Sequence, residues 1–174
     1  MLEVFKEWFI RWKCRKEFNR IGFNNQEKPE KIKTVAIVLD EKLGIDESVF
    51  IEFASSLKVA KNKVSVLLYA DKNLQLPSAK LERQRIWYDD ISLFGKVETD
   101  TNEFFRKDYD LVLNYFNRSN MILKLLSLKC KGKFRVGFGN VDHRLNDLIL
   151  NLETWQTKQF LEESIKYLRI IFND

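Results

Sequence analysis

Residues 34–39 read TVAIVL, a short and almost unbroken run of apolar side chains that is rich in β-branched residues. Such a run is typical of a strand that is buried on both faces of a parallel sheet. A polar segment at 22–33, which contains Pro29, precedes it, and apolar residues with helical spacing follow at 46–57. This order of linker, strand and helix predicts the start of an α/β domain.

The rest of the chain repeats the alternation. VSVLLY at 64–69 and LVLNYF at 111–116 predict two more strands, and weaker patterns predict others at 85–88, 134–138 and 147–152. Helical spacing recurs at 120–130 and 155–172, with a helical turn at 104–107. We therefore expect an α/β fold: one three-layer, Rossmann-like domain at 31–174, with a mostly parallel sheet of about five strands and a basic amphipathic helix and linker at 1–30.

The composition limits the kinds of site that the chain can form. The chain has 174 residues, of which 45% are hydrophobic and 32% charged, as in a single globular domain. One His and two Cys exclude a multi-His metal site, a four-Cys zinc site and a disulfide framework. No signal-peptide core is visible, and no stretch approaches the roughly 18 apolar residues of a membrane span. We expect a cytoplasmic protein without a transmembrane segment.

The loop after the first strand argues against a bound nucleotide. It reads DEKLG at 40–44, with one glycine and two carboxylates that would repel phosphate. A dinucleotide fold needs several glycines there, and no phosphate-binding Gly-rich loop followed by Lys occurs elsewhere. The sequence predicts neither a cofactor nor a metal, and no catalytic residue stands out.

Positive charge is concentrated in two places. Residues 1–33 carry nine Lys and Arg against five Glu, whereas the remaining residues are nearly neutral. No acid occurs at 111–141, which holds Arg118, Lys124, Lys129, Lys131, Lys133 and Arg135. If both segments form one continuous open patch, they favour an anionic partner such as nucleic acid, the ribosome or an acidic membrane. The alternative is a solvated surface that acids from elsewhere balance.

The N-terminal helix combines aromatic and basic side chains. Phe5, Trp8, Phe9 and Trp12 recur at spacings of three and four, and Arg11, Lys13, Arg15 and Lys16 lie among or after them. This pattern suits a membrane interface, and it suits a partner groove or a nucleic acid surface equally well. The remaining interpretation is that the aromatic side chains pack on the domain's own core or on a second copy of the chain.

Polar residues at two predicted strand ends form a candidate anion or ligand site. The first group is Asn114, Asn117, Arg118, Ser119 and Asn120, where a capped helix begins beside an arginine. The second group is Arg144, Asn146 and Asp147, near His143, which could pair with Asp142 or Asp147 as acid and base. The structural alternative for both groups is an ordinary helix cap and a polar turn.

Two resemblances follow from longer stretches. RKDYDLVLNY at 106–115, a helix, and KFRVGF at 133–138 resemble the N-terminal Rossmann-like half of heptosyltransferase-type glycosyltransferases. In those enzymes a second half holds most of the nucleotide-sugar donor, and 174 residues leave no room for one. Over nearly its full length the chain resembles a domain-of-unknown-function family of small Bacteroidota proteins, through KTVAIVLDE, DLVLNYF, FRVGF, HRLNDLIL and FLEESIKYLRIIF. That resemblance implies no activity.

These patterns leave three functional hypotheses. The first is a non-catalytic cytoplasmic protein that binds an anionic partner, either RNA and the ribosome or a peripheral membrane surface. The second is a small-molecule-binding protein, or a glycosyltransferase-like enzyme half, with its anion site at the carboxyl ends of the strands. The third is a structural or assembly protein that docks, or forms homo-oligomers, through the N-terminal helix.

Overall fold

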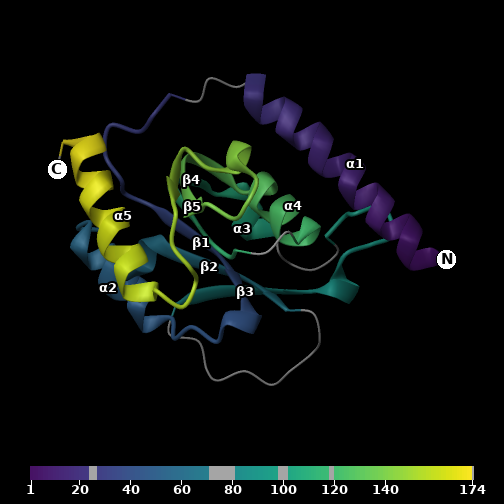
Figure 1. The fold of residues 1–174 in the computed structure, drawn as a ribbon, viewed down its shortest axis with the longest axis horizontal. Helices are drawn as coiled ribbons and strands as arrows, with labels where there is room; N and C mark the ends of the chain where they lie inside the picture. Colours follow the sequence, from purple (N-terminus) through teal and green to yellow (C-terminus); the bar gives the residue numbers. More distant parts are fainter. Residues whose placement is uncertain (24–26, 71–80, 98–101, 118–119, 174) are drawn as a thin grey trace.

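The computed structural model describes residues 1–23, 27–70, 81–97, 102–117 and 120–173. Figure 1 shows a central sheet with helices on both sides. The described helices are α1 (Leu2–Phe23), α2 (Ser48–Ser56), α3 (Asn102–Arg106), α4 (Met121–Lys129) and α5 (Thr157–Phe172). The strands are β1 (Val35–Asp40), β2 (Val64–Ala70), β3 (Glu82–Trp87), β4 (Asp108–Tyr115), β5 (Lys131–Phe138) and β6 (Leu148–Leu150).

The sheet confirms the expected α/β fold and refines it. Its strands follow the order β3-β2-β1-β4-β5-β6, and all five neighbouring pairs are parallel. The sheet therefore has six strands where about five were expected, and it is wholly parallel. The strand order reverses between β1 and β4, which is the position where ligands bind in many open parallel sheets.

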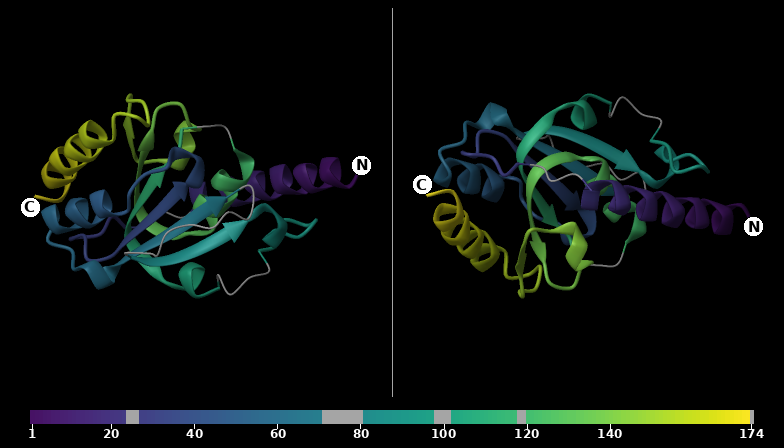
Figure 2. Two further views of the ribbon diagram at one scale, coloured as in Figure 1. Left: turned by 90° about the horizontal axis from the view of Figure 1, so that it is seen from below. Right: turned by 90° about the horizontal axis from the view of Figure 1, so that it is seen from above.

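The TVAIVL run is buried because helices cover both faces of β1. Successive side chains of a strand point to opposite faces. Val35, Ile37 and Leu39 face the layer of α2 and α5, whereas Ala36 and Val38 face the layer of α1 and α4. The two views in Figure 2 show α5 and α2 on one side of the sheet and α1 on the other. Both faces of the central strand thus belong to the hydrophobic core.

Among the described residues, no helix is both long enough and apolar enough to cross a bilayer. The same residues contain no group of three or more His, Cys, Asp or Glu side chains that could hold a metal ion.

The two cysteines are buried, and we expect them to be unreactive in the folded protein. Burial raises the pKa of Cys14 to about 11 and that of Cys130 to about 12. With these pKa values, at most about one thiol in a thousand is ionised at pH 8. Since the thiolate is the nucleophile, both cysteines should react slowly. A disulfide reagent at pH 8 should label neither thiol in the native chain within minutes and both in guanidinium. Rapid native labelling would contradict the burial of these residues.

Candidate partner-binding surface

Helix α1 packs on the domain through a narrow stripe on one face. Ile10 and Cys14 are each only 2% exposed and belong to the same core as α4. The Cys14 thiol donates a hydrogen bond to the Met121 carbonyl oxygen at 3.4 Å. Phe18 packs partly against the same core. Helix α1 therefore packs on its own domain, but through residues that the sequence did not single out. The alternative in which its aromatic side chains make this contact is wrong for Phe5, Trp8 and Trp12, which are exposed.

The opposite face of α1 carries exposed aromatic side chains. Phe5 is 53% exposed, Trp8 58% and Trp12 48%. They succeed one another at spacings of three and four, so they line one side of the helix. We call Phe5, Trp8 and Trp12 the outer stripe. Figure 1 shows α1 along the periphery of the molecule, with its N-terminal end lying beyond the sheet. Since exposed apolar patches usually mark binding sites, the outer stripe is a candidate interaction surface.

A tight turn at 92–96 extends this surface. Phe9 is partly buried, and its ring lies 5.0 Å from that of Trp8 and 5.0 Å from that of Phe94, both edge to face. Phe94 is 59% exposed. Gly95 has φ +66, a left-handed conformation that glycine adopts readily, and its missing side chain leaves room for Lys13. Sequence reasoning missed Phe94, because one aromatic residue in a short loop carries no periodic signal.

Cations adjoin the outer stripe, whereas the acids of α1 lie elsewhere. Arg11, Arg15 and Lys16 are exposed, and the Lys16 Nζ lies 5.5 Å from the Trp12 ring centre. The acids Glu3 and Glu7 lie near the Tyr88 hydroxyl group, because their charges, after burial, raise its pKa.

Contacts on the flanks hold α1 in place. The Lys6 Nζ donates a hydrogen bond to the Tyr88 carbonyl oxygen at 2.8 Å and lies 3.8 Å from the ring centre. About two turns further along, Lys13 is half-buried, and its positive charge adds to the effect of burial in lowering the pKa of Lys129. Glu17, which forms an ion pair with Arg20 at 2.8 Å, opposes that shift. The outer stripe therefore faces away from the contacts that fasten the helix.

The expected continuous patch built from both basic segments is wrong. Arg135 is only 6% exposed and lies inside the core. The Lys133 Nζ pairs with the Asp110 Oδ1 at 3.3 Å, and the Lys131 Nζ donates to the Arg106 carbonyl oxygen. These cations of the acid-free stretch are thus buried or bonded to other groups, and Arg118 lies outside the described residues.

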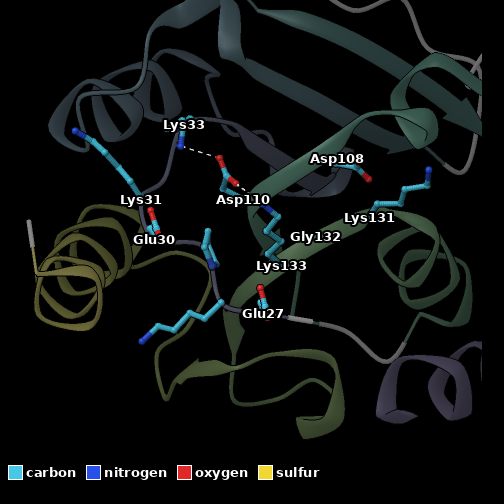
Figure 3. Close-up of a pocket in the computed structure, with 11 residues that line it drawn as sticks. Glu27, Glu30, Lys31, Lys33, Asp108, Asp110, Lys131, Gly132 and Lys133 are labelled. Carbon is cyan, nitrogen blue, oxygen red and sulfur yellow. Dashed lines mark hydrogen bonds and ion pairs between the residues drawn. The ribbon is translucent and has the colours of Figure 1, made fainter. Parts of the chain in front are cut away.

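Lysines of the two segments do meet in one hollow, but acids lie between them. Figure 3 shows this hollow of about 710 Å³ at the amino ends of β4 and β5. Its charged lining consists of Lys28, Lys31, Lys33, Lys131 and Lys133 together with Glu27, Glu30, Asp108 and Asp110. Asp110 accepts hydrogen bonds from the backbone N–H groups of Lys33 and Thr34 at 2.9 and 3.1 Å. Because carboxylates interleave with the lysines, this hollow has little net charge.

The predicted ligand residues Asn114 and Asn146 are brought together in a buried network. The Asn114 Nδ2 donates to the Asn146 Oδ1 at 2.7 Å, and the Ser127 Oγ donates to the Asn114 Oδ1 at 2.7 Å. Gly137 makes this possible, because a Cβ there would lie 2.4 Å from the Asn146 Nδ2. Asn114 has no exposed surface. Its amide therefore joins β4 to α4 and to the turn before β6.

Arg135 also belongs to this buried network. Its guanidinium donates to the Ser127 carbonyl oxygen at 2.8 Å and to the Cys130 carbonyl oxygen. Both carbonyls lie at the carboxyl end of α4, where unpaired acceptors and the helix dipole favour a cation. Asp147 accepts a hydrogen bond from the Arg135 backbone N–H at 2.7 Å, and burial raises the pKa of this carboxyl group. Asp147 thus fastens the chain after the turn to β5.

The other predicted site residues lie apart from this network. Asn120 caps α4, since its Oδ1 accepts from the backbone N–H groups of Ile122 and Leu123 at 2.8 and 3.2 Å. Asn117 is half-buried, and Arg118 and Ser119 lie outside the described residues.

The turn at 142–147 has its own internal bonds. The Arg144 guanidinium binds the Asp142 carboxylate at 3.0 and 2.8 Å, and this hydrogen bonding lowers the pKa of Asp142. The His143 Nε2 lies 3.1 Å from the Gly139 carbonyl oxygen. In the described residues, this histidine therefore contacts a backbone carbonyl and neither of the two aspartates proposed as its partner.

A small hollow of about 300 Å³ lies under α1 near the carboxyl ends of the strands. Its lining includes Arg11 of α1, Tyr69 of β2 and the N-terminal turn of α4. Two of the polar groups around it have partners within the domain: Asn120 caps α4, and the Tyr88 carbonyl oxygen accepts from Lys6. The lining also includes Glu7.

Comparison with known proteins adds the family. Neither a curated protein nor a solved structure matches the chain. Residues 6–171 match the family described as a Family of unknown function (DUF6913), and this match covers all but the last residue of α5 and all but the first four residues of α1. The chain therefore belongs to this family of unknown function.

Proposed function

We propose that the protein is a non-catalytic binding protein that engages an anionic partner, RNA and the ribosome or a membrane surface, through α1. The observation that supports this most is the outer stripe, whose three aromatic side chains are about half exposed and adjoin three exposed cations. Full burial of such a side chain is worth roughly 1.5–3 kcal/mol, so leaving it half exposed forgoes about half of that free energy. An interaction surface accounts for that arrangement, whereas the core does not require it.

The charge distribution supports an anionic partner rather than a neutral one. The described acids of α1 are Glu3 and Glu7, which lie near Tyr88, and Glu17, which pairs with Arg20. The outer stripe is followed along the helix by Arg15 and Lys16. Positive charge beside an exposed apolar face attracts anions and steers their approach. The expected cytoplasmic location and the resemblance to heptosyltransferase-type enzymes remain predictions.

A charge-reversal experiment tests the proposal. Arg11→Glu, Arg15→Glu and Lys16→Glu in one variant should weaken binding to RNA on filters, or to anionic vesicles in sedimentation, by at least about a hundredfold, from roughly 1 kcal/mol per cation at the surface. The matched control carries Lys61→Glu, Lys63→Glu and Lys158→Glu, which change the net charge equally but lie outside α1.

We expect the binding of the wild-type protein to weaken as the salt concentration rises. The control variant should bind as the wild type does. Equal losses in the two variants would show a net-charge effect without a defined face. The absence of salt-sensitive binding to both targets would remove the proposal.

The outer stripe also favours a second candidate function, assembly through α1. Two copies could cover their exposed aromatic side chains against each other. Deleting the helix is a poor test, because Ile10 and Cys14 belong to the core. Trp8→Ser with Trp12→Ser is better, since both side chains are exposed. If assembly is the function, the solution mass of the wild type should exceed one chain and fall in this variant.

A further inference from the structure

We infer that the partner is the surface of a lipid bilayer that contains anionic lipids, and that the protein binds it with α1 lying flat in the headgroup region. This inference rests on the proposed function, because it names the partner of the same face. It also assigns a second contact, Phe94 in the turn at 92–96, which no sequence pattern indicates. Three observations carry it.

The first observation is the kind of apolar side chain that is exposed. Leu2 and Val4 are 72% and 71% exposed, in the same half of α1 as Phe5 and Trp8. Aliphatic side chains offer no ring on which a nucleotide base can stack, and base stacking is how single strands use exposed aromatics. They do contribute to the apolar face that an interfacial helix buries at the boundary between headgroups and acyl chains. Tryptophan prefers that same boundary.

The second observation is that the apolar surface comes from two elements side by side. The Phe94 ring meets the Phe9 ring, which in turn meets the Trp8 ring, each at a centroid distance of 5.0 Å. Phe94 is nevertheless 59% exposed. The helix and the turn thus form one apolar surface, in which the Phe9 ring links Trp8 to Phe94. A bilayer surface can cover both elements at once.

The third observation is the excess of positive charge in the second half of α1, since the cations and acids of the first half are equal in number. The apolar side chains Leu2, Val4, Phe5 and Trp8 occupy its first half, and Arg15 and Lys16 follow Trp12 in its second half. Lys96 is exposed beside Phe94. Long basic side chains can keep their charged ends among the lipid phosphates while their methylene stems lie on the apolar boundary. This layout matches an anionic membrane, and the shared chemistry is a phosphate-bearing headgroup.

The test uses the full chain and vesicles of two compositions: phosphatidylcholine alone, and equal parts phosphatidylcholine and phosphatidylglycerol. Trp8→Ser with Trp12→Ser should weaken sedimentation with the mixed vesicles by about a hundredfold, from roughly tenfold per aromatic side chain removed. Phe94→Ser should weaken it by several-fold to about tenfold. Trp155→Ser is the matched control, because this tryptophan is 79% exposed and precedes α5.

Filter binding to RNA, measured with the same variants and with the charge-reversal variant of Arg11, Arg15 and Lys16, separates the inference from the proposed function. The membrane inference predicts that the wild type binds weakly to phosphatidylcholine alone and strongly to mixed vesicles. Binding to mixed vesicles should fall in the double tryptophan variant of α1 and in Phe94→Ser, and it should be unchanged in Trp155→Ser. RNA binding that depends on Arg11, Arg15 and Lys16, without vesicle binding, would overturn the inference and leave the proposed function standing. Failure to bind either target would overturn both. The thermal unfolding of each variant is compared with that of the wild type, so that a loss of binding is not mistaken for misfolding.

Discussion

Arg135→Ala is expected to lower the free energy of unfolding by about 3 kcal/mol. The guanidinium is buried and supplies donors to the Ser127 and Cys130 carbonyl oxygens at the end of α4. Removing it leaves buried acceptors without donors and opens a cavity where the side chain packed. Urea unfolding followed by circular dichroism measures the change.

Two further variants keep this prediction testable. Lys133→Ala, two residues earlier on the same strand, removes an exposed ion pair with Asp110 and should change the stability by less than about 1 kcal/mol. Arg135→Lys retains the charge but lacks the planar fork, so its loss should lie between the other two. If Arg135→Ala were as stable as Lys133→Ala, the buried position of this arginine would be wrong.

Asn114→Ala should cost about 2–4 kcal/mol, because it removes the acceptor of the buried Ser127 hydroxyl group and the donor to the buried Asn146 Oδ1. Asn117→Ala is the control from the same predicted site, and as a half-buried loop residue it should change the stability by only about 0.5 kcal/mol. A large stability loss in Asn114→Ala points to a structural residue. Wild-type stability in that variant would instead return Asn114 to the list of candidate ligand groups.

The sheet was predictable because its strands carry a strong local signal. TVAIVL, VSVLLY and LVLNYF are buried on both faces, so their sequences are apolar without alternation. The edge strand β3 was harder, since Glu82, Arg83 and Arg85 give it a polar sequence. A side-chain cap at the start of α4, from Ser119 or Asn120, was also predictable, because capping depends on residues only two and three positions away, and the structure shows Asn120 in this role.

The orientation of α1 was not predictable. The helix has two faces that can be covered, one with Ile10 and Cys14 and one with Phe5, Trp8 and Trp12, and periodicity alone does not tell which faces the core. The burial of Arg135 escaped prediction for a similar reason. Its acceptors are backbone carbonyls of α4, and only the placement of α4 over β5 brings them to the side chain.

The most direct test of the docking face follows the accessibility of Trp8 itself. A variant that keeps Trp8 and carries Trp12→Phe, Trp87→Phe and Trp155→Phe reports on one side chain of the outer stripe. Acrylamide should quench its fluorescence strongly in the unbound protein and much less when mixed phosphatidylcholine and phosphatidylglycerol vesicles are present. Vesicle-bound protein whose Trp8 remains as open to acrylamide as before would show that another face makes the contact, and would contradict the account.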